Sequence, residues 1–234
     1  MTWLWRTCFS LLAVAAPAAA ATISGAISLA DSREPSVRRK DFSGVVVWLE
    51  PVGRSSPLPA PGVFTMRQKG KRFIPHVLAI PVGSMVDFPN LDPIFHNAFS
   101  NFAGQPFDTG LYPPGTSQRI VFRREGTVRV FCNIHSAMSA VILVLRTSHY
   151  AVTGPDGRFQ LEGVPPGDYQ FRVWHERASD ATLEKLERRL SVAGSAVTVG
   201  PVVISESGYL ELPHKNKFGR DYPPEPRPGY RVTP

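Results

Sequence analysis

The stretch Phe131-Cys132-Asn133-Ile134-His135-Ser136-Ala137-Met138 decides the fold of this chain of 234 residues. It places a thiol, an imidazole and a thioether in one short loop. The alternating pattern over residues 122–130 predicts a strand that carries Cys132 toward the interior. The near-continuous apolar run over residues 140–145 predicts a buried strand that fixes the far end of the loop. The sequence therefore predicts a loop of metal-ligand residues anchored between two strands.

A second imidazole is offered upstream by His96, in a turn-rich loop that follows the strand-like run over residues 82–88. Two histidines and one cysteine in a near-trigonal plane, with a weak axial methionine, form a type 1 copper site, and soft sulfur ligands favour copper over harder metals. The predicted metal ligands are therefore His96, Cys132, His135 and Met138. The predicted cofactor is one type 1 copper ion.

One early ligand followed by three late ones, with Cys-x-x-His-x-x-Met spacing, resembles the cupredoxins, and amicyanin more than plastocyanin. The resemblance covers roughly residues 64–147 and includes the turn and strand over residues 82–88. It implies a Greek-key β-sandwich that carries one electron, with the more exposed His135 as the electron route. It also implies that Asn97 ties the two ligand loops together.

The N-terminus has the features of a secretory signal over residues 1–21: Arg6, an apolar run over residues 8–16, and small residues at the cleavage site. Cleavage removes Cys8 and leaves Cys132, which in an exported protein is an unpaired thiol or a metal ligand. The alternative is that Cys132 serves only as a small buried hydrophobic residue of the core. We expect a periplasmic or secreted protein with no membrane span after processing.

The sequence argues against other metal centres and against catalytic sites that use a cysteine. A binuclear copper centre needs two bridging cysteines, and multicopper oxidases need His-x-His pairs, which the sequence lacks. A closed zinc site could use Cys132, His96 and His135, but it has little use for Met138. A Cys-His nucleophile is a further alternative, although no hydrolase-like motif surrounds Cys132. We therefore expect a protein that is not an enzyme.

The composition, with 23 prolines and 19 glycines, favours short strands and many turns, hence an all-β protein. The formal charge of +7 suits a redox partner protein that is acidic at its docking face. Nucleic acid is not expected as a partner, because the basic residues are scattered and the protein is exported.

A second resemblance lies over residues 151–174, where Asp156-Gly157 and Pro165-Pro166-Gly167 predict tight turns between short strands. This run resembles the carboxypeptidase regulatory-like, transthyretin-like sandwich, a pairing similar to proteins of the methylamine-utilisation type. Strands over residues 22–29 and 43–50 would belong to the same sandwich, because they are too few to bury a core alone. A cupredoxin sandwich would then be inserted in, or joined to, a small transthyretin-like one.

The predicted division is residues 1–21 signal peptide, 22–58 first strands of the regulatory-like sandwich, 59–147 copper-binding domain, 148–208 remainder of the regulatory-like sandwich, and 209–234 Pro-rich basic tail. Disorder is expected for the tail. His76 shares a predicted strand face with apolar residues, which favours a core histidine, or one that supports the metal ligands without binding the metal, over a further metal ligand. The functional alternative to electron transfer is a non-redox copper-binding module, or an adhesion module that binds carbohydrate.

Overall fold

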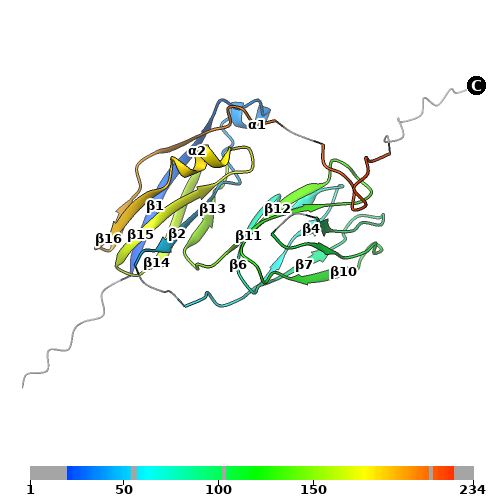
Figure 1. The fold of residues 1–234 in the computed structure, drawn as a ribbon, viewed down its shortest axis with the longest axis horizontal. Coiled ribbons are helices and arrows are strands. Elements are labelled where there is room, and N and C mark those ends of the chain that lie inside the picture. The colour runs from blue at the N-terminus through cyan, green and yellow to red at the C-terminus, as the bar shows by residue number, and fades with distance from the viewer. Residues whose placement is uncertain (1–19, 54–56, 102–103, 211–212, 224–234) are drawn as a thin grey trace, which may run out of the picture.

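A computed structural model describes residues 20–53, 57–101, 104–210 and 213–223, and over these residues the chain is almost entirely β. Figure 1 shows two lobes of strands side by side. Two short helices, α1 (Pro35–Arg38) and α2 (Asp180–Glu184), lie in the first lobe. The predicted all-β class is confirmed. Within the described ranges neither helix has the length or apolar character of a membrane span. The predicted signal peptide falls almost wholly outside them.

The first lobe packs two sheets around one apolar core. One sheet has the order β14-β1-β17, with β18 also paired to β1, and the other has the order β13-β2-β15-β16. The strands are β1 (Ala21–Ala30), β2 (Val46–Pro51), β13 (Tyr150–Val152), β14 (Arg158–Val164), β15 (Gly167–Trp174), β16 (Arg188–Val192), β17 (Ala196–Thr198) and β18 (Val202–Ser205). The inward side chains alternate along β1 and β15, so both strands show the period-two burial of a half-buried strand.

Strands from before residue 52 therefore share both sheets with strands from after residue 149. Ile23 on β1 stands opposite Leu161 on β14, and Leu49 on β2 stands opposite Phe171 on β15. All four side chains are buried in the same core. The boundaries predicted at residues 58/59 and 147/148 stay predictions.

The second lobe holds the predicted ligand loop. A five-stranded sheet has the order β6-β12-β11-β8-β9, a three-stranded sheet has the order β10-β7-β3, and β4 pairs with β5. The strands are β3 (Val63–Thr65), β4 (Arg67–Gln68), β5 (Phe73–Ile74), β6 (Val77–Pro81), β7 (Met85–Pro89), β8 (Phe99–Ser100), β9 (Phe107–Asp108), β10 (Ser117–Val121), β11 (Gly126–Phe131) and β12 (Ser139–Leu145). The apolar core between the sheets includes Cys132 and Met138.

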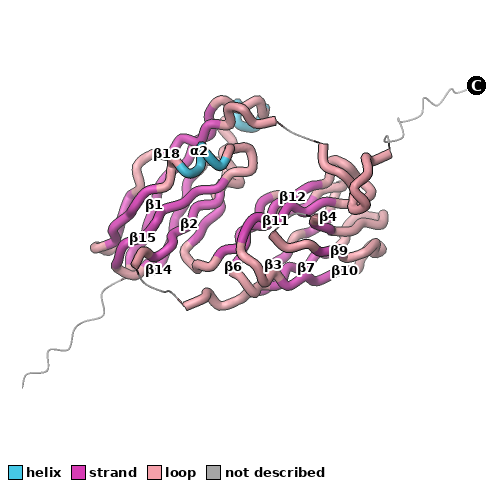
Figure 2. The backbone as a smooth tube through the Cα atoms, in the orientation of Figure 1, coloured by secondary structure: helices cyan, strands magenta, loops and turns pink. Residues whose placement is uncertain are grey.

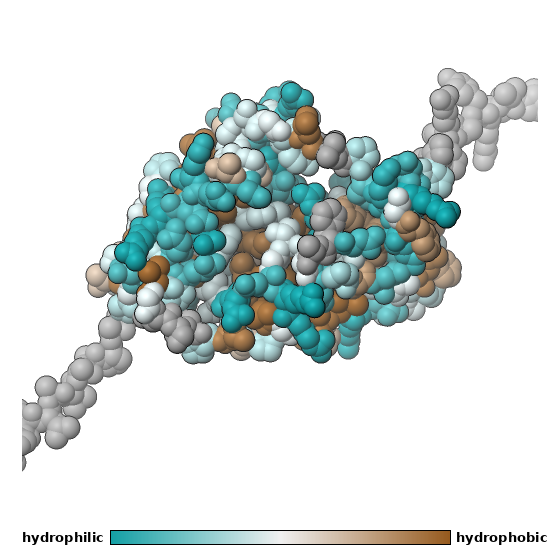
Figure 3. All heavy atoms as spheres, viewed as in Figure 1, coloured by the Kyte–Doolittle hydropathy of each residue, from teal (hydrophilic) through white to brown (hydrophobic). Residues whose placement is uncertain are grey.

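Strand β12 is buried on both faces, which explains its continuous apolar run. Ala140, Ile142 and Val144 face the core that contains Cys132. Leu143 and Leu145 face a separate apolar cluster between the lobes, formed with residues of β2 and β6. Figure 3 shows apolar residues at the junction of the lobes on the face that it draws.

Candidate metal centre

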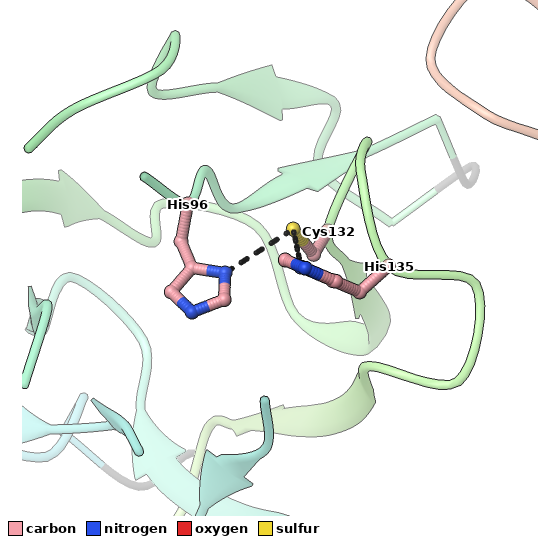
Figure 4. Close-up of side chains that lie close together, drawn as sticks. All are labelled: His96, Cys132 and His135. Carbon is pink, nitrogen blue, oxygen red and sulfur yellow. Dashed lines mark hydrogen bonds between the residues drawn. The ribbon is translucent and has the colours of Figure 1, made fainter. Parts of the chain in front are cut away.

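Three donor atoms converge at the end of β11 in the second lobe. Cys132 directly follows β11, His135 lies in the loop before β12, and His96 lies between β7 and β8. The Sγ atom of Cys132 is 3.7 Å from Nδ1 of His96 and 3.7 Å from Nδ1 of His135. Figure 4 shows both imidazoles turned toward the sulfur. The structure thus brings together three of the four predicted ligands.

The spacing of these atoms fits a metal ion. All three donors lie within 4.8 Å of one another. Three donors at about 2.1 Å from a common centre in a trigonal plane would stand about 3.6 Å apart, which is close to the two sulfur–nitrogen distances. One thiol and two imidazoles, with His96 and Cys132 fully buried, are a donor set that suits copper or zinc.

The thiol of Cys132 is held in an environment that favours its thiolate. Burial raises its pKa, but a hydrogen bond to His96 and backbone N–H groups of Asn97, Ile134 and His135 lower it, and the net direction is down. The thiolate is the metal-binding form of cysteine.

His96 is fixed in the orientation that metal binding needs. Its Nε2 donates a hydrogen bond to Oδ2 of Asp92 at 2.8 Å, and this pair is buried. Burial lowers the pKa of His96, but its bonds to Cys132 and Asp92 raise it more. A carboxylate on the second nitrogen sets the tautomer and increases the basicity of the nitrogen that binds the metal.

Asp92 is in turn held by two backbone groups. The N–H of Gly70 donates to Oδ1 at 2.6 Å and the N–H of Lys71 donates to Oδ2 at 2.8 Å. Burial raises the pKa of Asp92, but these two N–H groups and His96 together lower it, so the carboxylate form is favoured. Sequence reasoning missed Asp92, although its position four residues before His96 was a usable signal.

Asn97 joins the two ligand loops as predicted. Its Oδ1 accepts a hydrogen bond from the N–H of Asn133 at 2.7 Å, and its Nδ2 donates to Asp108 at 3.2 Å. The loop of His96 and the loop of Cys132 are thereby fixed to each other.

Met138 closes the ligand loop (residues 131–138). Its N–H donates to the carbonyl of His135 at 3.1 Å, and its carbonyl accepts from the N–H of Cys132 at 3.1 Å. The side chain is fully buried in the same core as Cys132. Its predicted role as the axial ligand stays a prediction.

His76 is not a core histidine, and it lies outside the three-donor cluster. Its side chain is 48% exposed. Its Nε2 bonds to Glu176 at 2.8 Å and its Nδ1 to the carbonyl of Ser139 at 3.1 Å. The prediction that His76 shares a strand face with alternate apolar residues is wrong, because β6 begins only at Val77. His76 precedes the strand and links the two lobes.

The described part of the predicted tail is ordered against the ligand loop, contrary to the expected disorder. Residues 213–223 form a loop segment without helix or strand, as Figure 2 shows. His214 stacks on Phe131 with ring centroids 3.9 Å apart. The hydroxyl of Tyr222 donates to the carbonyl of Cys132 at 2.8 Å. We call this segment the C-terminal strap.

No family model matches the chain, and no curated protein matches it. The solved structures that match include cupredoxins. A purple cupredoxin from Nitrosopumilus maritimus is 26% identical, with 35% of this chain and 98% of that chain covered and a TM-score of 0.33. The reduced Cu(I) form of an amicyanin variant is 17% identical, with 42% of this chain and 98% of that chain covered and a TM-score of 0.34.

A Cu-containing nitrite reductase (NirK) from Thermus scotoductus SA-01 is 27% identical over 52% of this chain and 28% of that chain, with a TM-score of 0.35. None of these three is a transthyretin-like protein, and that resemblance stays a prediction. Because the TM-scores are below 0.5, the case for a metal in this chain rests on its own donor geometry. Over part of its length, the chain is similar to copper proteins of the cupredoxin kind.

Proposed function

We propose that this protein is an exported type 1 copper protein that carries one electron and is not an enzyme. The observation that carries the proposal is the pair of equal 3.7 Å distances from the buried Sγ of Cys132 to the Nδ1 atoms of His96 and His135. Copper bound there would supply the change between Cu(I) and Cu(II). The thioether of Met138, buried at the end of the same loop, favours copper over zinc, which does not use such a ligand.

The residues around the donors would keep the site nearly unchanged during electron transfer. Cys132 would bind as thiolate, supported by the hydrogen bonds that lower its pKa. His96 would bind as a neutral imidazole whose other nitrogen is fixed on Asp92. The bond from Asn97 to the backbone of Asn133 would hold the two ligand loops at constant separation.

The surface beside the site would let a partner approach closely. His135 is the least buried of the three clustered ligands. Large apolar side chains on the surrounding loops are exposed, at 44% for Ile134, 53% for Phe95 and 38% for Ile94. Contiguous exposed apolar patches mark interaction surfaces, and we propose that these side chains together form such a patch beside the site. The proposed partner is a redox protein with an acidic docking face, to match the charge of +7.

The test is to load the purified protein with Cu(II) and record its absorption spectrum. We expect an intense blue colour from thiolate-to-copper charge transfer. Cys132→Ser should abolish this colour, while the matched control His76→Gln should keep it, because His76 lies outside the donor cluster. A colourless Cu(II) complex, or preferential retention of zinc from a copper-replete medium, would contradict the assignment.

A further inference from the structure

The C-terminal strap contacts the ligand loop at successive positions rather than at one point. His214 stacks on Phe131, and its Nε2 bonds to the carbonyl of Ser136 at 2.6 Å. Tyr222 donates to the carbonyl of Cys132 at 2.8 Å. The strap therefore contacts the ligand loop at its first residue, Phe131, at the ligand residue Cys132, and again at Ser136.

A second set of contacts fixes the middle of the strap. The N–H of Lys217 donates to Oδ1 of Asn133 at 3.0 Å, and its Nζ lies 2.6 Å from Oδ2 of Asp108. Asn133 and Asp108 are also the two residues that bond to Asn97. The strap thus joins the hydrogen-bond network that ties the two ligand loops together.

The strap is also braced within itself. Oδ1 of Asn216 accepts the N–H groups of Phe218 and Arg220 at 3.0 and 3.1 Å, and the N–H of Asn216 donates to the carbonyl of Arg220 at 2.9 Å. Lys215 pairs with Asp221 at 2.5 Å. Nδ1 of His214 lies 3.3 Å from the hydroxyl of Tyr222. A segment folded on itself costs less entropy to dock than an extended chain of the same length.

We propose that the C-terminal strap locks the ligand loop, and that its release is the local opening through which Cys132 becomes accessible to metal ions and thiol reagents. His214 and Tyr222 are then positioning residues that act through the backbone of the loop. The loop carries Cys132, His135 and Met138 together, so its opening would disassemble most of the site at once. The part of this proposal that concerns metal exchange rests on the proposed copper site, whereas the part that concerns Cys132 does not.

The decisive experiment measures how fast a thiol reagent modifies Cys132 in the metal-free full chain, with the label located by peptide mass analysis because the sequence also contains Cys8. Tyr222→Phe removes only the hydroxyl, and His214→Phe keeps an aromatic ring on Phe131 but removes Nε2. We expect each variant to speed labelling by about tenfold, as for the loss of one hydrogen bond of about 1.4 kcal/mol. The matched control is Arg220→Ala, whose strap contacts run through its backbone.

Labelling is repeated at several denaturant concentrations below the unfolding transition. Opening of the strap is local, so the labelling rate should hardly depend on denaturant, whereas labelling through global unfolding rises steeply with it. Equal rates in Tyr222→Phe, His214→Phe and Arg220→Ala would overturn the lock. A steep dependence on denaturant in the first two variants would also overturn it, because they would then act only on overall stability.

A second arm uses the copper-loaded proteins and follows the loss of the blue colour after a chelator is added. We expect copper to leave Tyr222→Phe and His214→Phe about tenfold faster than Arg220→Ala. Equal rates would overturn the metal-exchange part of the proposal. If the protein without substitutions binds no copper, the proposed function fails. The labelling of Cys132 in the metal-free protein still decides the role of the strap.

Discussion

Replacing Asp92 with asparagine should raise the reduction potential of bound copper by on the order of 100 mV. A metal at Nδ1 of His96 would stand about 6 Å from the carboxylate, because the 2.8 Å contact at Nε2, the imidazole ring and a metal–nitrogen bond of about 2 Å lie in series. At an effective dielectric constant of about 20, one unit charge at that distance contributes about 2.8 kcal/mol. This corresponds to about 120 mV for one electron. The sign is positive because the lost carboxylate stabilises Cu(II) more than Cu(I).

The same change should weaken Cu(II) binding by about 10- to 100-fold, the usual effect of losing such a partner. The asparagine oxygen can still accept a bond, but its NH₂ group would face an N–H donor of Gly70 or Lys71. One buried donor is then left without an acceptor. A shift of 100 mV equals about 2.3 kcal/mol, or about 50-fold in relative affinity, so the two expected effects agree.

The assay is an anaerobic redox titration with mediators, followed at the charge-transfer band, together with a competitive copper titration. Asp87→Asn is the matched control, since it removes the same charge from a residue bonded to Ser117 and Arg119. If the potentials of Asp92→Asn and Asp87→Asn do not differ, Asp92 does not act on the metal through His96, and the reasoning is refuted.

Three further outcomes are expected. Met138→Leu should keep the blue colour and raise the potential in the same titration, because loss of a weak axial donor destabilises Cu(II); loss of copper binding would contradict a weak axial role. His76, whose pKa is raised by its bond to Glu176, stabilises the fold at pH values below its unfolded pKa of about 6.5. Its contribution is lost as pH rises through the raised folded pKa, so urea midpoints of the unmodified protein and His76→Gln should converge at high pH. Gly157→Ala should cost at least about 2 kcal/mol in urea unfolding, because φ is +70° and the added Cβ would overlap a carbonyl of β1. Gly110→Ala, with φ +66° and open space around the added Cβ, should lose less free energy of unfolding. Equal losses in the two variants would show that the positive φ, and not the overlap with the carbonyl, causes the destabilisation.

The ligand loop is predictable because its chemistry is local. Cys132, His135 and Met138 lie in one loop, and alternation along β11 places Cys132 inward. The second histidine, His96, follows from the need for another nitrogen donor. The spacing of Asp92 four residues before His96 was a signal in the sequence, but the backbone N–H groups of Gly70 and Lys71 that hold its carboxylate could not be predicted from the sequence.

Composition misled at the C-terminal strap. Proline and basic residues are typical of disorder, but the strap is held by particular contacts of His214, Lys217 and Tyr222 with the ligand loop. Amino-acid composition carries no information about such specific contacts, so it could not predict that the strap packs on the loop. The link between His76 and Glu176 escaped for a related reason, since the two residues are 100 positions apart.

Strand β12 limits how the lobe that holds the donor cluster could be moved between proteins. Recombination that transplanted this lobe alone would uncover Leu143 and Leu145, together with Val77 and Ala79 beside them on β6. These side chains would form an apolar stripe on the outside of the sheet, and such stripes promote aggregation or unintended dimers. A viable transplant would need polar replacements at these alternate positions, or a new neighbour to cover them. The lobe therefore cannot be transferred to another protein without changes to this face of its sheet.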